Sequence, residues 1–138
     1  MKDRTAPLFA ILALVLAACG GEENRPASWE YISPAIIQPN CATSSCHSKA
    51  AAVAGLDLSE TGNGYRSLMG QSLPTRPDTD YKGNNPPRVL VVPGNPTQSR
   101  IVNMMRGIGA NLMPPDRPLP EADIALIEEW ILAGASND

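Results

Sequence analysis

The sequence has few aromatic side chains and a single histidine. Its 138 residues include one Phe, two Trp and three Tyr, and Phe9 lies in an apolar N-terminal run rather than in the body of the chain. A domain of about 100 residues with so few large side chains has difficulty filling a core from its own atoms. Either aliphatic residues fill that core, or a bound group does.

The chain also lacks a basic surplus and a long hydrophobic run. It carries 11 Lys and Arg against 14 Asp and Glu, a net charge of −3, with no basic stripe, which argues against a nucleic-acid partner. The apolar run of residues 6–18 (APLFAILALVLAA) is too short to span a bilayer stably. No internal repeat or second domain is apparent, and the length suits one domain.

The N-terminal run instead has the form of an export signal. Lys2 and Arg4 precede it, and it ends in LAAC, with Cys19 last. A basic start, an apolar segment and a small-residue exit are typical of a secretory signal peptide. The LAAC ending resembles the bacterial lipobox, in which the cysteine is lipidated and begins the mature chain. A signal peptide whose cleavage falls near Cys19 by chance is the alternative.

We therefore predict a lipoprotein signal over residues 1–18, lipidation at Cys19 and a location on the periplasmic side of a bacterial membrane. Gly20 lacks the aspartate associated with inner-membrane retention, which slightly favours the outer membrane. The small and polar residues that follow predict a flexible tether over 19–28. A single mainly α domain is predicted over 29–138, with short helices and long Gly/Pro-rich loops.

Its clearest helix is predicted from about Glu121 to Ala133. Pro120 lies at or near the first position, acidic residues occupy the first turn, and Gly134 closes the helix. About half of its circumference is apolar, so it should pack against a core.

Weaker patterns predict the other elements. Ser33 and Pro34 suit the start of a helix that Pro39 stops after a turn or two, and CHSKAAAVAG suits a short helix ended by Gly55. A helical turn is expected in GYRSLMG, an extended segment in RVLVV, and a helix in QSRIVNMMR that Thr97 caps and Gly107 ends.

The segment CATSSCH, residues 41–47, ends in the only histidine. With Cys19 lipidated, Cys41 and Cys46 form a pair in an oxidising compartment. In a c-type haem site two cysteine sulfurs add to the porphyrin vinyl groups, and the adjacent histidine ligates the iron. Four residues between the cysteines can bulge outward without moving either sulfur. On this motif alone, a covalent haem and a Cys41–Cys46 disulfide with His47 as a bystander are equal alternatives.

Two other chemistries fit the motif poorly. A structural zinc site needs four ligands, so a carboxylate would have to join Cys41, Cys46 and His47. A cysteine–histidine hydrolase is disfavoured because adjacent Cys and His side chains rarely face each other productively.

A second axial ligand favours the haem. Iron held by histidine commonly takes a methionine sulfur on its other face. Met113 lies in NLMPPDRP, whose prolines stiffen the loop around a weak ligand, although a packing role is the alternative. Met104 and Met105 lie at helical spacing and are assigned to packing, and Met69 is poorly placed.

The motifs AGLDLS, VVPGNPTQSRIV and LMPPDRPLPEADIALIEEWILAGA follow one another in an order that resembles the small c-type cytochrome domains of exported bacterial proteins. The match runs from about residue 29 to 135. The resemblance implies a mainly α cytochrome c-like fold around one haem c, with Cys41 and Cys46 in thioether bonds, His47 as proximal ligand and Met113 as distal ligand. It also implies that Trp130 and Ile127 pack near the haem.

Two positions depart from the family pattern. The C-x4-C-H spacing is longer than the usual C-x-x-C-H, and Pro120 replaces the serine-like cap before the last helix, at a cost of about 1 kcal/mol.

The resulting expectation is a lipid-anchored monohaem cytochrome, not an enzyme, that carries electrons between redox proteins of the cell envelope. The first alternative is a haem-free binding or structural lipoprotein with a Cys41–Cys46 disulfide. The second retains haem without Met113 ligation and leaves an open site for a small gas or peroxide.

Overall fold

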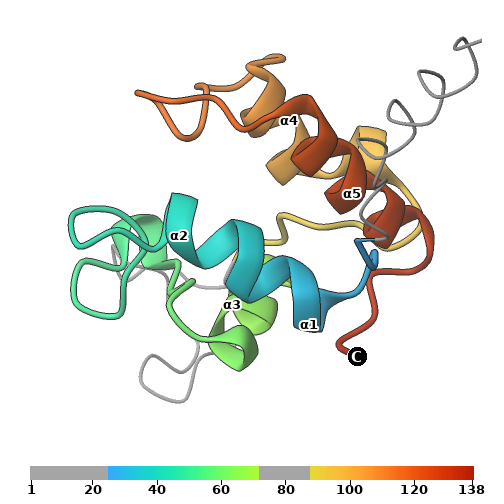
Figure 1. The fold of residues 1–138 in the computed structure, drawn as a ribbon. Helices are drawn as coiled ribbons and strands as arrows, with labels where there is room; N and C mark the ends of the chain where they lie inside the picture. Colours follow the sequence, from blue (N-terminus) through green and yellow to red (C-terminus); the bar gives the residue numbers. More distant parts are fainter. Residues whose placement is uncertain (1–24, 72–87) are drawn as a thin grey trace, which may run out of the picture.

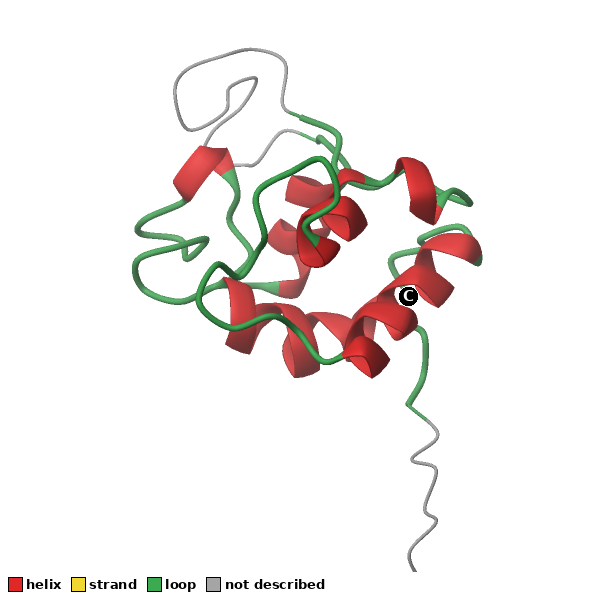
Figure 2. Cartoon of the chain, turned by 90° about the horizontal axis from the view of Figure 1, so that it is seen from above, coloured by secondary structure: helices red, strands yellow, loops and turns green. Residues whose placement is uncertain are grey.

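The computed structural model describes residues 25–71 and 88–138. The predicted signal peptide (1–18), Cys19 and the first part of the tether lie outside these residues. No strand occurs within the described ranges (Figure 2), which confirms a mainly α domain. The helical elements, shown in Figure 1, are α1 (Trp29–Ile32), the π-helix η1 (Ser33–Ile37), α2 (Gln38–Cys41), the 3-10 turn η2 (Val53–Gly55), α3 (Thr61–Leu68), the 3-10 turn η3 (Pro96–Gln98), α4 (Arg100–Arg106) and α5 (Glu121–Leu132).

The N-terminal helix is longer than predicted. Elements α1, η1 and α2 follow one another without a break from Trp29 to Cys41, so the expected start at Ser33 and stop at Pro39 are wrong. Between its two prolines the chain winds as a π-helix, and the Gln38 amide donates to the Ser33 carbonyl. A π-helical turn is a common way to accommodate an interrupted α-helical ladder.

Burial explains why this helix tolerates two prolines. Ile32, Ile36 and Ile37 each expose 1% of their surface or less. Full burial of one such side chain stabilises a fold by roughly 1.5–3 kcal/mol, which offsets the hydrogen bonds that Pro34 and Pro39 cannot donate.

The helix predicted within residues 46–55 does not form. Only the short turn η2 is helical there, and Ala52 and Ala54 adopt left-handed φ angles of 39° and 57°. The backbone folds back on itself, with the Val53 amide donating to the Cys46 carbonyl at 3.0 Å and the Leu58 amide donating to His47 at 2.8 Å. Alanine content predicted a helix, but these bonds wrap the chain around His47 instead.

The predictions for the middle of the chain are partly confirmed. Helix α3 contains the expected turn, and α4 ends at Gly107, whose φ is 65°. The predicted Thr97 cap is wrong: the Asn95 side chain accepts from the Gln98 amide at 3.2 Å and begins η3. The RVLVV segment forms no strand, and its Leu90 amide donates to the Leu68 carbonyl at the end of α3, at 2.9 Å.

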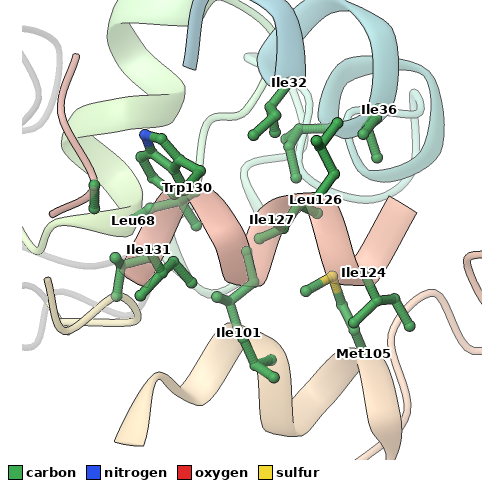
Figure 3. Packing of buried hydrophobic residues seen from close by; sticks show 14 of the residues in the cluster. Ile32, Ile36, Leu68, Ile101, Met105, Ile124, Leu126, Ile127, Trp130 and Ile131 are labelled. Carbon is green, nitrogen blue, oxygen red and sulfur yellow. The ribbon is translucent and has the colours of Figure 1, made fainter. Parts of the chain in front are cut away.

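Helix α5 matches its prediction closely. It runs from Glu121 to Leu132, with Pro120 at the N-cap position and Ala133 at the C-cap. Its apolar face joins the core with α4, where Met105 and Ile124 belong to one buried cluster (Figure 3). On the outside of this contact the Arg106 guanidinium pairs with Glu121 at 2.7 Å and Glu128 at 2.9 Å. The last helix is therefore fixed to α4 by both packing and charge.

Three aromatic residues of the described domain gather in one place. The rings of Trp29 and Trp130 stack 5.0 Å apart, and Tyr65 lies edge-on to both at 6.1 and 6.5 Å. Their polar atoms are satisfied, because the Trp29 indole donates to Thr61 and the Trp130 indole to Ser136. This cluster joins α1, α3 and α5.

Aliphatic residues supply most of the remaining core. They come from the helices and from the loops that connect them, and include Ile32, Ile36, Ile37, Leu58, Leu68, Leu90, Val91, Ile101, Val102, Leu119, Ile124, Leu126, Ile127 and Ile131.

The two ends of the described domain lie together. Arg25 pairs with Asp123 of α5 and its guanidinium lies 3.3 Å from the Tyr31 hydroxyl, so residues 25–28 of the predicted tether rest against the domain. The Glu30 amide donates to the Asp138 carbonyl at 3.4 Å, and Figure 1 shows the C-terminus beside α1. Among the described residues no helix is long and apolar enough to cross a membrane.

Candidate functional site

Three of the predicted site residues line one pocket. Cys41 ends α2, His47 follows in the next loop, and Met113 lies in the loop before α5. The cavity measures about 40 Å³ and is partly open to solvent, so its walls would have to move apart to admit a cofactor, whose sites typically measure roughly 300–1,000 Å³. The rest of its wall is apolar or carries thioether sulfur, and consists of Leu56, Leu58, Leu68, Leu90, Ile101, Met104 and Met105.

The loops that carry His47 and Met113 lie on the same side of the molecule, at the left of Figure 1. The pocket is therefore formed by residues that lie far apart in the sequence, from Cys41 to Met113.

The Cys41–His47 segment is a closed loop. The His47 amide donates to the Cys41 carbonyl at 3.1 Å, and the Cys46 amide donates to Thr43 at 3.0 Å. Thr43, Ser44 and Ser45 are exposed. Three of the four residues between the cysteines thus bulge into solvent, while the two ends of the motif stay joined by a backbone hydrogen bond.

The His47 ring is held in one tautomer. Its Nδ1 lies 2.9 Å from the Val53 carbonyl oxygen, and a carbonyl only accepts, so Nδ1 carries the proton and the neutral ring keeps its lone pair on Nε2. Burial lowers the pKa of His47, opposed in part by the bond to Val53. Metal-binding histidines commonly donate their second ring nitrogen to a backbone carbonyl in this way.

The two cysteines have different surroundings. Both carry free thiols in the described part of the chain. Cys41 lines the pocket, and burial, with a smaller contribution from neighbouring Cys46, raises the pKa of its thiol to about 11. Cys46 is not part of the pocket wall, and its sulfur lies 3.7 Å from the Ser45 hydroxyl oxygen.

Met113 is anchored to α4 through its backbone. Its amide donates to the Met104 carbonyl at 3.0 Å, where α4 approaches its end. Ile101, Met104 and Met105 all line the pocket, so one face of α4 forms part of the wall at i, i+3 and i+4 spacing. Sequence reasoning assigned Met104 to packing, because helical spacing alone cannot distinguish a core face from a pocket wall.

A buried carboxylate organises the loop below the pocket. Asp57 is 3% exposed and accepts hydrogen bonds from the Ser59 amide and hydroxyl and from the Asn63 side chain. Its neighbours Leu56 and Leu58 line the pocket. This gives the AGLDLS motif a structural role.

Two residues implied by the family resemblance lie elsewhere. Trp130 stacks on Trp29, and Ile127 is buried in the core; neither lines the pocket. The stacking turns Trp130 toward α1 rather than toward the pocket.

Within residues 25–71 and 88–138, no three His, Cys, Asp or Glu side chains cluster as metal ligands.

No protein-family model, curated protein or solved structure matches the chain. The pocket and the donor atoms around it are therefore the basis for a functional proposal.

Proposed function

We propose that this protein is a lipid-anchored monohaem c-type cytochrome that carries electrons between redox proteins of the cell envelope, and that it is not an enzyme. The observation that carries the proposal is the meeting of Cys41, His47 and Met113 in one apolar pocket. These residues come from different parts of the chain, and cysteine, histidine and methionine are the residue types that commonly hold a c-type haem.

The donor set fits one haem c. His47 offers an imidazole nitrogen whose tautomer the Val53 carbonyl holds, and Met113 offers a thioether. The leucines around them provide an apolar setting, as a buried macrocycle needs. A haem bound here would supply an iron that changes reversibly between the ferrous and ferric states.

Each residue has a distinct role in the proposal. Cys41 and Cys46 form the thioether bonds, and His47 is the proximal ligand, oriented by Val53. Met113 is the distal ligand, which together with the apolar wall raises the reduction potential. A cytochrome c-like fold, with short helices and long loops around one haem, is part of the same proposal.

Export and anchoring belong to the same proposal. Residues 1–18 direct the chain across the membrane, and the lipid on Cys19 holds it on the periplasmic side, with the outer membrane slightly favoured. Such an anchor confines electron exchange to partners at that membrane surface. Labelling with a radioactive fatty acid, with Cys19→Ala as the unlabelled control, tests this part alone.

The haem proposal is tested in a host that matures c-type cytochromes. The absorption spectrum of the denatured, reduced protein in alkaline pyridine should show a c-type haem in the parent protein and in Cys19→Ala. It should be weakened or lost in Cys41→Ala and Cys46→Ala. Absence of haem from the parent protein, under conditions that load a known cytochrome, would refute the proposal.

Electron transfer is then measured by potentiometric titration. We expect one reversible one-electron transition in the parent protein. His47→Ala should lose the six-coordinate spectrum, because no other histidine exists in the chain to replace it. An unchanged spectrum in that variant would remove His47 from the ligand set.

A further inference from the structure

A second methionine occupies the pocket next to the proposed distal ligand. Met104 and Met113 both line the pocket, and both are half-buried. The backbone hydrogen bond from the Met113 amide to the Met104 carbonyl, at 3.0 Å, holds the two residues side by side. The pocket wall therefore contains two methionines whose backbones are hydrogen-bonded to each other.

We propose that Met104 is a second distal ligand, so that either Met104 or Met113 can bind the iron. This inference rests on the proposed haem site. Both sulfurs have the same donor strength, and the methionine side chain has three rotatable bonds with which to reach a position a few ångströms away. The choice between them is then set by geometry rather than by chemistry.

The third methionine of the wall provides a matched control. Met105 is only 4% exposed and belongs to the buried cluster between α4 and α5 (Figure 3). Moving its sulfur toward the iron would open a cavity in the core, which costs free energy. Met104, one position earlier on the same helix, is half-buried and does not belong to that cluster.

A second methionine ligand changes how the iron is coordinated when Met113 is removed. With a single ligand, removal of Met113 leaves the distal position open, so the ferrous form binds carbon monoxide readily. With two ligands, Met104 takes the vacant position and the iron stays bound to sulfur. The distal site would then tolerate movement of the Met113 loop without losing its coordination.

Four variants test this: Met104→Leu, Met113→Leu, the double variant and Met105→Leu. Leucine approximately conserves the volume of methionine, so folding should be retained, and covalent haem content and helical circular dichroism verify it. The measurement is the sulfur-to-iron absorption band of the oxidised protein, together with carbon monoxide binding to the ferrous form.

We expect the band in the parent protein and in all three single variants, and its loss, with rapid carbon monoxide binding, in the double variant alone. Loss of the band in Met113→Leu or in Met104→Leu would overturn the inference, because one methionine would then be the sole ligand. A band that survives in the double variant, or is missing from the parent protein, overturns it as well. Absence of covalent haem is a separate outcome that refutes the proposed function itself.

Discussion

The haem-free protein should lose stability at alkaline pH because of one thiol. Burial in the pocket raises the pKa of Cys41 from its ordinary value of 9.0 to about 11. The unfolded thiol gives up its proton first, so between these two values the unfolded state binds fewer protons than the folded state. The free energy of unfolding therefore falls as the pH rises through this window.

The size of the loss follows from the two pKa values. Raising the pH from about 8 to about 10.5 should cost about 2 kcal/mol through Cys41 alone. The assay is urea denaturation of reduced, haem-free protein at both pH values. Other groups titrate in the same range, so the quantity of interest is the difference between the parent protein and its cysteine variants.

Cys41→Ala should lack this part of the alkaline loss. Cys46→Ala should keep most of it, because Cys46 contributes only the smaller, electrostatic cause of the raised pKa of Cys41. With haem attached, the Cys41 sulfur is a thioether with no proton to release, so the effect should disappear. An equal pH dependence in the parent protein and Cys41→Ala would refute the burial of this thiol in the pocket.

Three further changes test the packing around the site, each by urea denaturation. Trp130→Ala should lower the free energy of unfolding by about 3–5 kcal/mol, since it removes half of the stacked pair; a cost near zero would contradict the stacking. Gly64→Val should cost about 1–3 kcal/mol more than Gly62→Val in the same helix. A Cβ on Gly64 lies 3.2 Å from the Trp29 indole, whereas a Cβ on Gly62 has nothing within 4 Å. Equal costs for the two variants would contradict the packing of α3 against Trp29. Asp57→Ala should lower the free energy of unfolding by about 1–3 kcal/mol, because the groups that donate hydrogen bonds to Asp57 lose their acceptor. The matched control Asp116→Ala, at an exposed position, should be nearly neutral. Equal losses in the two variants would show that the Asp57 hydrogen bonds do not stabilise the fold.

The sequence predicted the elements whose local signals agree with their packing. Helix α5 has acidic residues in its first turn, an apolar face and Gly134 after its end, and its observed bounds lie within a residue of the predicted ones. Helix α4 ends at Gly107 because the left-handed φ of 65° favours a residue without a side chain.

Tertiary contacts decided the elements that were predicted wrongly. Two prolines suggested an early stop, but the buried face of Ile32, Ile36 and Ile37 carries the N-terminal helix on to Cys41. Alanine content suggested a helix after Cys46, but hydrogen bonds from Val53 and Leu58 fold that segment back around His47. Neither packing partner is visible within the local sequence.

The sequence predicted some of the residues of the candidate site but not the whole pocket wall. The CATSSCH motif and the proline-flanked Met113 lead to three residues that line the pocket. The contribution of Met104 could not be read from the sequence, since its helical spacing also suits an ordinary core position. The orientation of the His47 ring depends on the Val53 carbonyl, a backbone atom that no sequence motif indicates.

The most direct test of the haem assignment is the intact mass of the denatured mature protein, purified without reductant from a host that matures c-type cytochromes. The proposal predicts the mass of the lipidated chain plus one haem, retained after denaturation and lost when Cys41 and Cys46 are both replaced by alanine. A mass two hydrogens below that of the reduced chain, with no haem, would instead show a Cys41–Cys46 disulfide. The protein would then be a haem-free binding or structural lipoprotein, and the proposed electron carrier would be wrong.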